Sequence, residues 1–241
     1  PGWKKSSAFL DTNPNVTIES GITGTGDLLS VDNLKYCNDT YANSMNVITA
    51  DGGFDFSIDF NKQESLATNL LFAQVSFAIA MQKKNGHFIL KIFDIFTKTT
   101  SDIIYLLSTL YRQVFIVKPN TSRLANSEKY IVCKYFKEPQ PLLINKIISE
   151  YPKLQTKPFI SSLFNFNLDY FYINKIEEYN AIFGQQQIEN ISCTLNLIGC
   201  KNKNEKLETF KKNNIQKCIQ WCERNNIPYN KSVATTNIFL N

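Results

Sequence analysis

The stretch Gly86–Phe96, GHFILKIFDIF, decides the fold of this 241-residue chain. A run so rich in Phe, Ile and Leu is typical of a strand that is buried in a covered sheet. One lysine, Lys91, lies inside the run, and a lysine is almost never fully buried without a partner. Two acidic residues, Asp51 and Glu128, adjoin similar apolar runs. We therefore predict that these three charged residues meet at one edge of one sheet.

The composition is that of a folded protein. Hydrophobic residues make up 43% of the chain and charged residues 20%, which suffices for a packed core and argues against global disorder. The length fits one α/β domain, or one such domain with an appendage. The net charge of +5 permits a polyanionic partner without requiring one. No stretch approaches the roughly 18 apolar residues of a membrane span, so we expect no membrane partner.

The six cysteines and the single histidine, His87, limit the metal and redox chemistry. The cysteines form no C-x-x-C pair, so we predict no structural zinc and no metal site. Cys133 lies in an apparent core strand, while Cys218 and Cys222 are four residues apart on a helical pattern. We interpret them as buried or half-buried free thiols of an intracellular, reducing compartment. With one histidine, triad hydrolysis is disfavoured.

Strands and helices alternate from residue 45 to residue 136, which is typical of an α/β sheet with helices on its faces. A short polar loop joins the last two strands, so we predict that they form an antiparallel pair at one edge of the sheet. Before this region, residues 1–45 read as turns. The first predicted elements are a short strand at Met45–Gly53 that ends in a tight turn, and a helix from Gln63 to Lys84 that Asn85-Gly86 stops. The strand around Lys91 and a helix that starts near Thr99 follow. The last two are strands at Gln113–Pro119 and Glu128–Phe136.

The character of the chain changes after residue 138. Asn, Lys, Ile and Phe dominate from there on, and helical patterns occur at 141–151, about 168–180 and 205–226. We predict a domain boundary at this point, with residues 1–138 forming the α/β part and residues 139–241 forming a mostly helical extension.

The predicted topology brings the three charges together. Ligands of open α/β sheets bind at the carboxyl ends of the strands, where Asp51 and Lys91 lie. Glu128 begins the last strand, whose start lies at the same edge if that strand is antiparallel. A lysine held there between carboxylates can hold or accept a proton from an alcohol that becomes a nucleophile. The alternatives are an ion pair of Lys91 with Asp94 or Glu64, and a turn-capping role for Asp51 before two glycines.

The glycine-rich segment GITGTGDLL, residues 21–29, allows two interpretations. Its spacing is not G-x-G-x-x-G, so the signal for a phosphate loop is weak. The segment is either a loop that presents Asp27 to a ligand or a turn without further function.

Four motifs carry a resemblance to a known family. GITGTGDLLSVDNL (21–34), ADGGF (50–54), KNGHFILKIFDIFT (84–97) and KPNTSRLANSEKYIVCK (118–134) follow one another in the chain. In this order they closely resemble the cap-specific mRNA 2′-O-ribose methyltransferases of the FtsJ-like class, most of all those that modify the first transcribed nucleotide. The resemblance covers roughly residues 20–136. It implies the C-terminal strands of a Rossmann-like methyltransferase sheet, with S-adenosyl-L-methionine as cofactor and the 5′ end of capped mRNA as partner.

The resemblance also implies roles for single residues. The family has a Lys-Asp-Lys-Glu tetrad, in which Asp51, Lys91 and Glu128 would be the aspartate, the second lysine and the glutamate. Such a lysine orients the ribose 2′-hydroxyl and helps to deprotonate it, and the carboxylates position the lysine. Gly26, Asp27 and Asp51 would bind the cofactor, with Asp27 on its adenosine part.

Candidates for RNA binding lie in the loop before Glu128 and in the extension. Basic side chains of the loop suit phosphate, and the alternative is a solvated loop. Aromatic residues of the extension either stack a base or belong to the core. The loop candidates are Lys118, Ser122, Arg123 and Asn126, and the aromatic ones are Phe164, Phe166 and Tyr170.

The family's Gly-rich cofactor loop and its first tetrad lysine have no match here, so we expect this chain to be the C-terminal portion of a longer enzyme or half of a split one. The leading hypothesis is a methyltransferase of capped mRNA. The alternatives are a catalytically inactive methyltransferase-like subunit that binds RNA or a partner, and a ribosomal or transfer RNA 2′-O-methyltransferase. Other capping enzymes are further expected partners. The expected location is the nucleus for a cellular source, and the cytoplasmic replication site or virion for a viral one.

Overall fold

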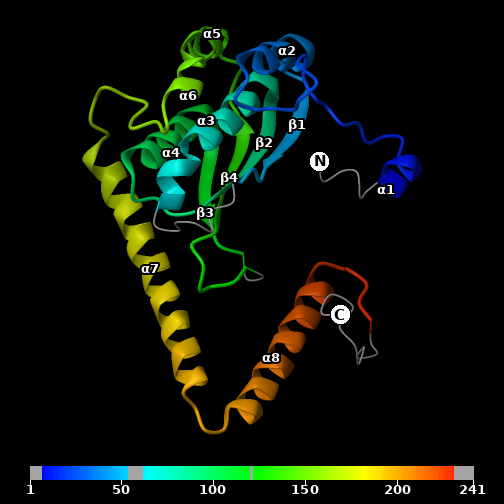
Figure 1. Cartoon of the computed structure of the whole chain (residues 1–241), viewed down its shortest axis with the longest axis vertical. Coiled ribbons are helices and arrows are strands. Elements are labelled where there is room, and N and C mark those ends of the chain that lie inside the picture. Colours follow the sequence, from blue (N-terminus) through cyan, green and yellow to red (C-terminus); the bar gives the residue numbers. More distant parts are fainter. Residues whose placement is uncertain (1–6, 54–61, 120–121, 231–241) are drawn as a thin grey trace. The chain divides into compact units, whose positions relative to one another are not determined.

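A four-stranded mixed sheet forms the centre of the fold (Figure 1). We describe it from a computed structural model, in which residues 7–53, 62–119 and 122–230 are described. β1 and β2 are parallel, and β4 runs antiparallel to both of its neighbours, β2 and β3. In the order β1-β2-β4-β3, the strands span Met45–Ala50, Gln82–Ile92, Lys129–Phe136 and Tyr111–Val117. The predicted α/β class and the antiparallel pair are confirmed.

Two helices connect the strands and supply most of the core. α3 (Gln63–Met81) links β1 to β2, and α4 (Lys98–Leu110) links β2 to β3. The side chain of Thr97 caps α4 by accepting from the Thr100 amide, as residues of this type favour at helix starts. The core between these helices and the sheet consists of fully buried apolar side chains, among them Val75, Phe88, Leu90, Ile92, Leu107 and Ile131.

The two faces of the sheet differ in cover. Successive side chains of a strand point to opposite faces, and in β2 the even-numbered Phe88, Leu90 and Ile92 are buried while the odd-numbered residues are half-buried. On the second face, Val47 is 59% exposed and Phe115 is 45% exposed. We predicted helices on both faces, and among the described residues they pack on one.

The turn at Asn85-Gly86 is a strand irregularity and not the predicted helix stop. α3 ends at Met81 and β2 begins at once with Gln82. Between the partners Met45–Gln82 and Val47–His87 the register shifts, so β2 contains extra residues at this point. Asn85 adopts φ +64°, and a Cβ on Gly86 would come within 2.8 Å of the Asn46 carbonyl oxygen. The bulge therefore requires glycine, and the prediction mistook it for a helix end.

Residues 1–45, which the sequence predicted to be rich in turns, also contain two helices. α1 spans Ser7–Thr12 and α2 spans Val31–Tyr41. Ser30 caps α2 by accepting from the Asn33 amide at 3.4 Å, which is a start signal that the glycine-rich segment before it obscured.

The second half of the chain is helical, as predicted, but the long helix was underestimated. α7 spans Tyr170–Ile198, where the sequence predicted only about 168–180. The chain divides into two compact units, Pro1–Gln187 and Ile188–Asn241, so the start of α7 belongs with the sheet. The predicted domain boundary at residue 138 stays a prediction. The remaining helices are α5 (Pro141–Glu150), α6 (Lys153–Thr156) and α8 (Lys203–Arg224).

One described helix, α3, has the length and apolar composition of a membrane span. Its sequence nevertheless includes polar residues such as Glu64, Asn69 and Gln74, so it is not a run of 18 apolar residues. The structure buries 72% of the apolar window, however, as expected for the core helix of a folded domain.

The six cysteines are free thiols. Cys37 and Cys133 are buried, and Cys200 and Cys222 are half-buried. Cys193 and Cys218 are exposed, which corrects the prediction for Cys218, because the helices that carry them leave most of their surface uncovered.

Candidate active site at the carboxyl edge of the sheet

The register of two parallel strands places Asp51 beside Lys91. Ala50 of β1 pairs with Leu90 of β2, so the next residue of each strand lies side by side at the carboxyl edge. The Lys91 ammonium forms an ion pair with the Asp51 carboxylate. The side chain of Lys91 is 17% exposed and that of Asp51 is 66% exposed. The lysine is therefore largely buried, and the carboxylate of the pair faces solvent.

The structure does not contain the alternative ion pairs for Lys91. Asp94 pairs with Lys129 at 3.6 Å instead. Glu64 is buried and accepts from the amides of Phe96 and Thr97 at 3.1 and 2.8 Å, so its carboxylate holds the start of α4. Both carboxylates thus have structural partners other than Lys91.

Glu128 lies just before β4 and is held by two hydroxyl groups. Its Oε1 accepts from Ser122 Oγ at 3.1 Å and from the Tyr130 hydroxyl at 3.3 Å. β4 begins at Lys129, one residue later than predicted, and its antiparallel direction places its start near the carboxyl ends of its neighbours. The carboxylate is therefore fixed directly before the strand that pairs with β2, which carries Lys91.

Tyr130 belongs to this site, and the sequence analysis missed it. Tyr130 is the register partner of Lys91 between β2 and β4. Burial raises the pKa of the Tyr130 hydroxyl, and the carboxylates of Glu128 and Asp51 raise it further. The hydroxyl thus lies in the field of both candidate catalytic carboxylates. Its position two residues after Glu128, on the same face of a strand, was the signal that could have found it.

The four residues predicted to bind RNA have different surroundings. Lys118 Nζ donates to the backbone carbonyl of Asn126 at 2.8 Å, to its side chain at 3.0 Å and to the Glu128 carbonyl at 2.7 Å. Burial lowers the pKa of Lys118, and Lys129 lowers it further. Ser122 is engaged with Glu128, as described, and Arg123 is exposed. The loop is therefore built around Glu128, and Arg123 is the one of the four side chains that it turns outward.

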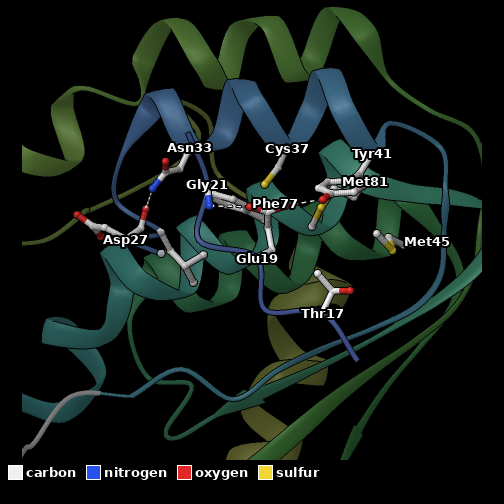
Figure 2. Close-up of a pocket in the computed structure, with 12 residues that line it drawn as sticks. Thr17, Glu19, Gly21, Asp27, Asn33, Cys37, Tyr41, Met45, Phe77 and Met81 are labelled. Carbon is white, nitrogen blue, oxygen red and sulfur yellow. Dashed lines mark hydrogen bonds between the residues drawn. The ribbon is translucent and has the colours of Figure 1, made fainter. Parts of the chain in front are cut away.

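Gly26 and Asp27 line a cavity of about 390 Å³ between the glycine-rich segment, α2 and α3 (Figure 2). Asp27 Oδ1 accepts from the Leu29 amide at 2.9 Å, and its carbonyl accepts from Asn33 Nδ2 at 3.0 Å. Gly26 has φ +66°, which fits the turn interpretation of the segment. The turn is thus observed, and its residues also line a cavity, while a ligand-binding role for Asp27 stays a prediction.

The lining of this cavity fits the adenosine part of a cofactor in size and chemistry. Small-molecule sites measure roughly 300 to 1,000 Å³ and combine apolar walls with a few polar groups. Here Phe77 and Met81 form apolar walls, and Asp27 keeps one carboxylate oxygen without a backbone donor. Asp51 is not among the lining residues, so the three predicted cofactor residues fall in two places.

A second carboxylate in the lining is already occupied. Glu19 accepts from the Tyr41 hydroxyl and from the Gly21 amide, which lowers the pKa of the carboxyl. The same hydrogen bond raises the pKa of Tyr41 to about 12. Glu19 therefore shapes the cavity, whereas Asp27 could bind a ligand there.

The aromatic residues of the extension divide between core and surface. Phe164 stacks on Phe166 with ring centroids 5.0 Å apart and contacts Tyr105 edge-on at 5.9 Å. Phe166 is 51% exposed and Tyr170 is 72% exposed. The core alternative thus fits Phe164 and does not fit the other two.

A metal centre finds no support in the described residues. Within residues 7–53, 62–119 and 122–230, no group of three His, Cys, Asp or Glu side chains could hold a metal ion.

The sheet thus carries a paired lysine and aspartate at the carboxyl edge of its parallel strands, and a cavity lined by Asp27 lies among the glycine-rich segment, α2 and α3. Residues 8–136, just over half of the chain, match the family of FtsJ-like methyltransferases. The chain therefore belongs to this family. Helices and a sheet in the observed order agree with the Rossmann-like fold that the resemblance implied.

Several curated relatives share the name cap-specific mRNA (nucleoside-2′-O-)-methyltransferase 1. The protein from Trypanosoma brucei brucei is 38% identical over 115 residues, which are 47% of this chain and 31% of that protein. The protein from Leishmania braziliensis is 37% identical over 130 residues, covering 53% and 32%. The Homo sapiens protein is 39% identical over 124 residues, covering 49% and 15%. The chain thus spans a third or less of the length of these relatives.

A solved structure with some likeness is that of a ribosomal RNA methyltransferase from Plasmodium falciparum. It is 21% identical, with a TM-score of 0.34, and the match covers 50% of this chain and 62% of that one. A likeness at this level carries no argument about function.

Proposed function

We propose that this chain carries the catalytic edge of an S-adenosyl-L-methionine-dependent RNA 2′-O-methyltransferase that acts on the first transcribed nucleotide of capped mRNA. The observation that carries the proposal is the Lys91–Asp51 ion pair at the carboxyl edge, with Glu128 fixed directly before the neighbouring strand. Family membership supports methyl transfer, and the names of the relatives support capped mRNA as the acceptor. Other capping enzymes would be its partners.

The chemistry asks for a base and for positioned charges. S-adenosyl-L-methionine, when bound, supplies the methyl group, and Asp27 would hold its adenosine part. Lys91, as the neutral amine, would orient the ribose 2′-hydroxyl and take up its proton while the oxygen bonds to the methyl carbon and the bond from that carbon to the donor's sulfur breaks. Asp51 would hold the ammonium that results, and Glu128 would add a second negative charge beside it. Catalysis of this kind depends mainly on orientation and on preorganised charge.

The test is methyl transfer from labelled S-adenosyl-L-methionine to a short capped RNA. The acceptors to compare are the capped RNA, the same RNA without a cap, and a capped RNA whose first nucleotide is 2′-deoxy. The proteins are the 241-residue chain and any longer natural polypeptide that contains it. We expect transfer to the capped RNA alone. Lys91→Ala should abolish transfer, while Lys134→Ala, an exposed lysine of β4, should leave it unchanged.

Other outcomes would support the other functions. Equal transfer to capped and uncapped RNA would favour a ribosomal or transfer RNA methyltransferase. A catalytically inactive RNA-binding subunit would be favoured if both the 241-residue chain and the longer natural polypeptide bind capped RNA but transfer no methyl group to it. The position of Asp51 outside the cavity that Asp27 lines is the specific observation in favour of that last possibility.

A further inference from the structure

A buried lysine directly follows the candidate catalytic Glu128. The side chain of Lys129 is only 4% exposed, and its ammonium pairs with Asp94 at 3.6 Å. It also donates to the carbonyls of Phe93 at 3.2 Å and Ser127 at 2.9 Å. Lys129 therefore ties the start of β4 to the segment that follows β2, and any shift of Lys129 moves its neighbour Glu128.

A further contact of Lys129 comes from α7. The Lys129 ammonium lies 5.5 Å from the centroid of the Phe183 ring, within the range of a cation–π interaction. One turn earlier on α7, Asn180 Nδ2 donates to the Ile95 carbonyl at 2.9 Å. Residues three apart share one face of a helix, so a single face of α7 reaches both places. All of these residues lie in the compact unit Pro1–Gln187.

These two contacts reach the chain on both sides of the site. Ile95 lies in the short segment between β2, which carries Lys91, and α4. Lys129 follows Glu128 at the start of β4. α7 thus contacts the segments that determine where both of these catalytic candidates lie. A second polar contact anchors the helix start, where the Tyr172 hydroxyl donates to a carbonyl of α4 at 2.8 Å.

We propose that Phe183 and Asn180 of α7 are positioning residues for methyl transfer, which hold Glu128 and Lys91 at their working separation through Lys129 and the segment around Ile95. The activity part of this inference rests on the proposed function. A helix that merely covered the sheet would lower stability when altered but would not change the turnover of the folded protein. The inference therefore requires that turnover and stability separate.

The variants are Phe183→Leu, which keeps an apolar side chain of similar reach but removes the ring, and Phe183→Tyr, which keeps the ring. Asn180→Ala removes the hydrogen bond to Ile95. Ile188→Ala is the control, because Ile188 lies on the same helix and is 61% exposed. We measure kcat and KM for capped RNA, and amide hydrogen exchange of residues 93–97 and 122–130.

We expect Phe183→Leu to lower kcat about tenfold, since small misplacements of catalytic groups are costly, with KM for RNA nearly unchanged. Asn180→Ala should lower kcat in the same direction, while Phe183→Tyr and Ile188→Ala should behave as the parent. Hydrogen exchange of residues 93–97 and 122–130 should be faster in Phe183→Leu and Asn180→Ala, and unchanged in Phe183→Tyr and Ile188→Ala.

Two results would overturn the inference. One is a folded Phe183→Leu protein with parental kcat, and the other is a Phe183→Tyr protein whose kcat is as low as that of Phe183→Leu. If Phe183→Leu does not fold, Asn180→Ala decides alone by the same measurements. If the parent protein transfers no methyl group to any RNA, the proposed function fails. The positioning contacts are then tested separately, because unchanged hydrogen exchange in Phe183→Leu and Asn180→Ala would refute them.

Discussion

Two lysine–carboxylate pairs lie at the same edge of the sheet, and they differ chiefly in exposure. In the pair Lys91–Asp51 the side chains are 17% and 66% exposed. In the pair Lys129–Asp94 the values are 4% and 32%. Each ammonium also lies over a phenylalanine ring, at 5.6 Å and 5.5 Å respectively. Residue types and partners are thus alike, and only the first pair can reach a substrate.

The period of a strand explains the difference. Lys91 and Tyr130 are register partners, as are Ile92 and Lys129. Because side chains alternate between the two faces, Lys91 projects to the half-exposed face and Lys129 projects to the face that the helices cover. One residue of displacement along a strand thus separates a candidate catalytic lysine from a structural one. The predictions below test this division.

The largest effect is expected for Lys91→Arg. Arginine keeps the positive charge and the ion pair with Asp51, but it does not release a proton in proteins and so cannot take one up. Methyl transfer should fall by about 10² to 10⁴-fold, the usual contribution of general acid–base catalysis. The melting temperature should stay close to the parental value. A variant with parental turnover would show that Lys91 acts through its charge alone.

The next effect concerns stability, in Lys129→Met. Methionine fills the space of the lysine stem but leaves the Asp94 carboxylate without its partner in a buried setting. We expect a loss of about 3 kcal/mol in the free energy of unfolding, at the low end for a broken buried pair because Asp94 is partly exposed. Urea denaturation measures it. Lys134→Met on the same strand is the control, for which we expect a change within about 0.5 kcal/mol. Equal losses in both variants would contradict the division.

The buried pair should also respond to pH. Burial raises the pKa of the Asp94 carboxyl above its usual 3.8, although Lys129 opposes this. Between pH 3.8 and the raised pKa of the folded state, the folded protein binds more protons on Asp94 than the unfolded chain does. The contribution of this group to the free energy of unfolding therefore falls as pH rises through the window. The unfolding free energy of the parent minus that of Asp94→Asn should accordingly decrease as pH rises above 3.8. A difference that grows with pH would show that the ion pair outweighs burial.

The sequence sufficed for the sheet because β2 and β4 are short apolar runs with clear turns. It failed where local signals competed with tertiary ones. The turn-like Asn85-Gly86 reads as a helix stop, yet the register shift against β1 makes it a bulge. The full length of α7 was missed because its outer half, from Ile188 on, buries little apolar surface.

For the site, the sequence predicted that Lys91 meets Asp51 at the edge of the sheet, but it left Asp94 and Glu64 as alternative partners. Asp94 lies three residues from Lys91 in the chain and was an open partner for it, and the register instead pairs Lys91 with Asp51. Tyr130 was missed because its relation to Lys91 exists only across the β2–β4 ladder. The contacts of Asn180 and Phe183 are more distant still in sequence, and no local pattern announces them.

The smallest effect is expected for the stability of Asp51→Asn, which completes the comparison with Asp94. Asp51 is largely exposed, and an exposed ion pair contributes at most about 1 kcal/mol because water and salt screen it. The free energy of unfolding should therefore change by less than about 1 kcal/mol, and added salt should reduce the difference further. The asparagine side chain keeps the shape and can still accept a hydrogen bond from Lys91, so any large loss of methyl transfer in this variant reflects the missing charge. Urea denaturation of the parent, Asp51→Asn and Lys129→Met at low and at high salt measures these changes in the free energy of unfolding. A loss in Asp51→Asn as large as that in Lys129→Met would mean that the carboxyl edge is held together by the pair that we assign to chemistry.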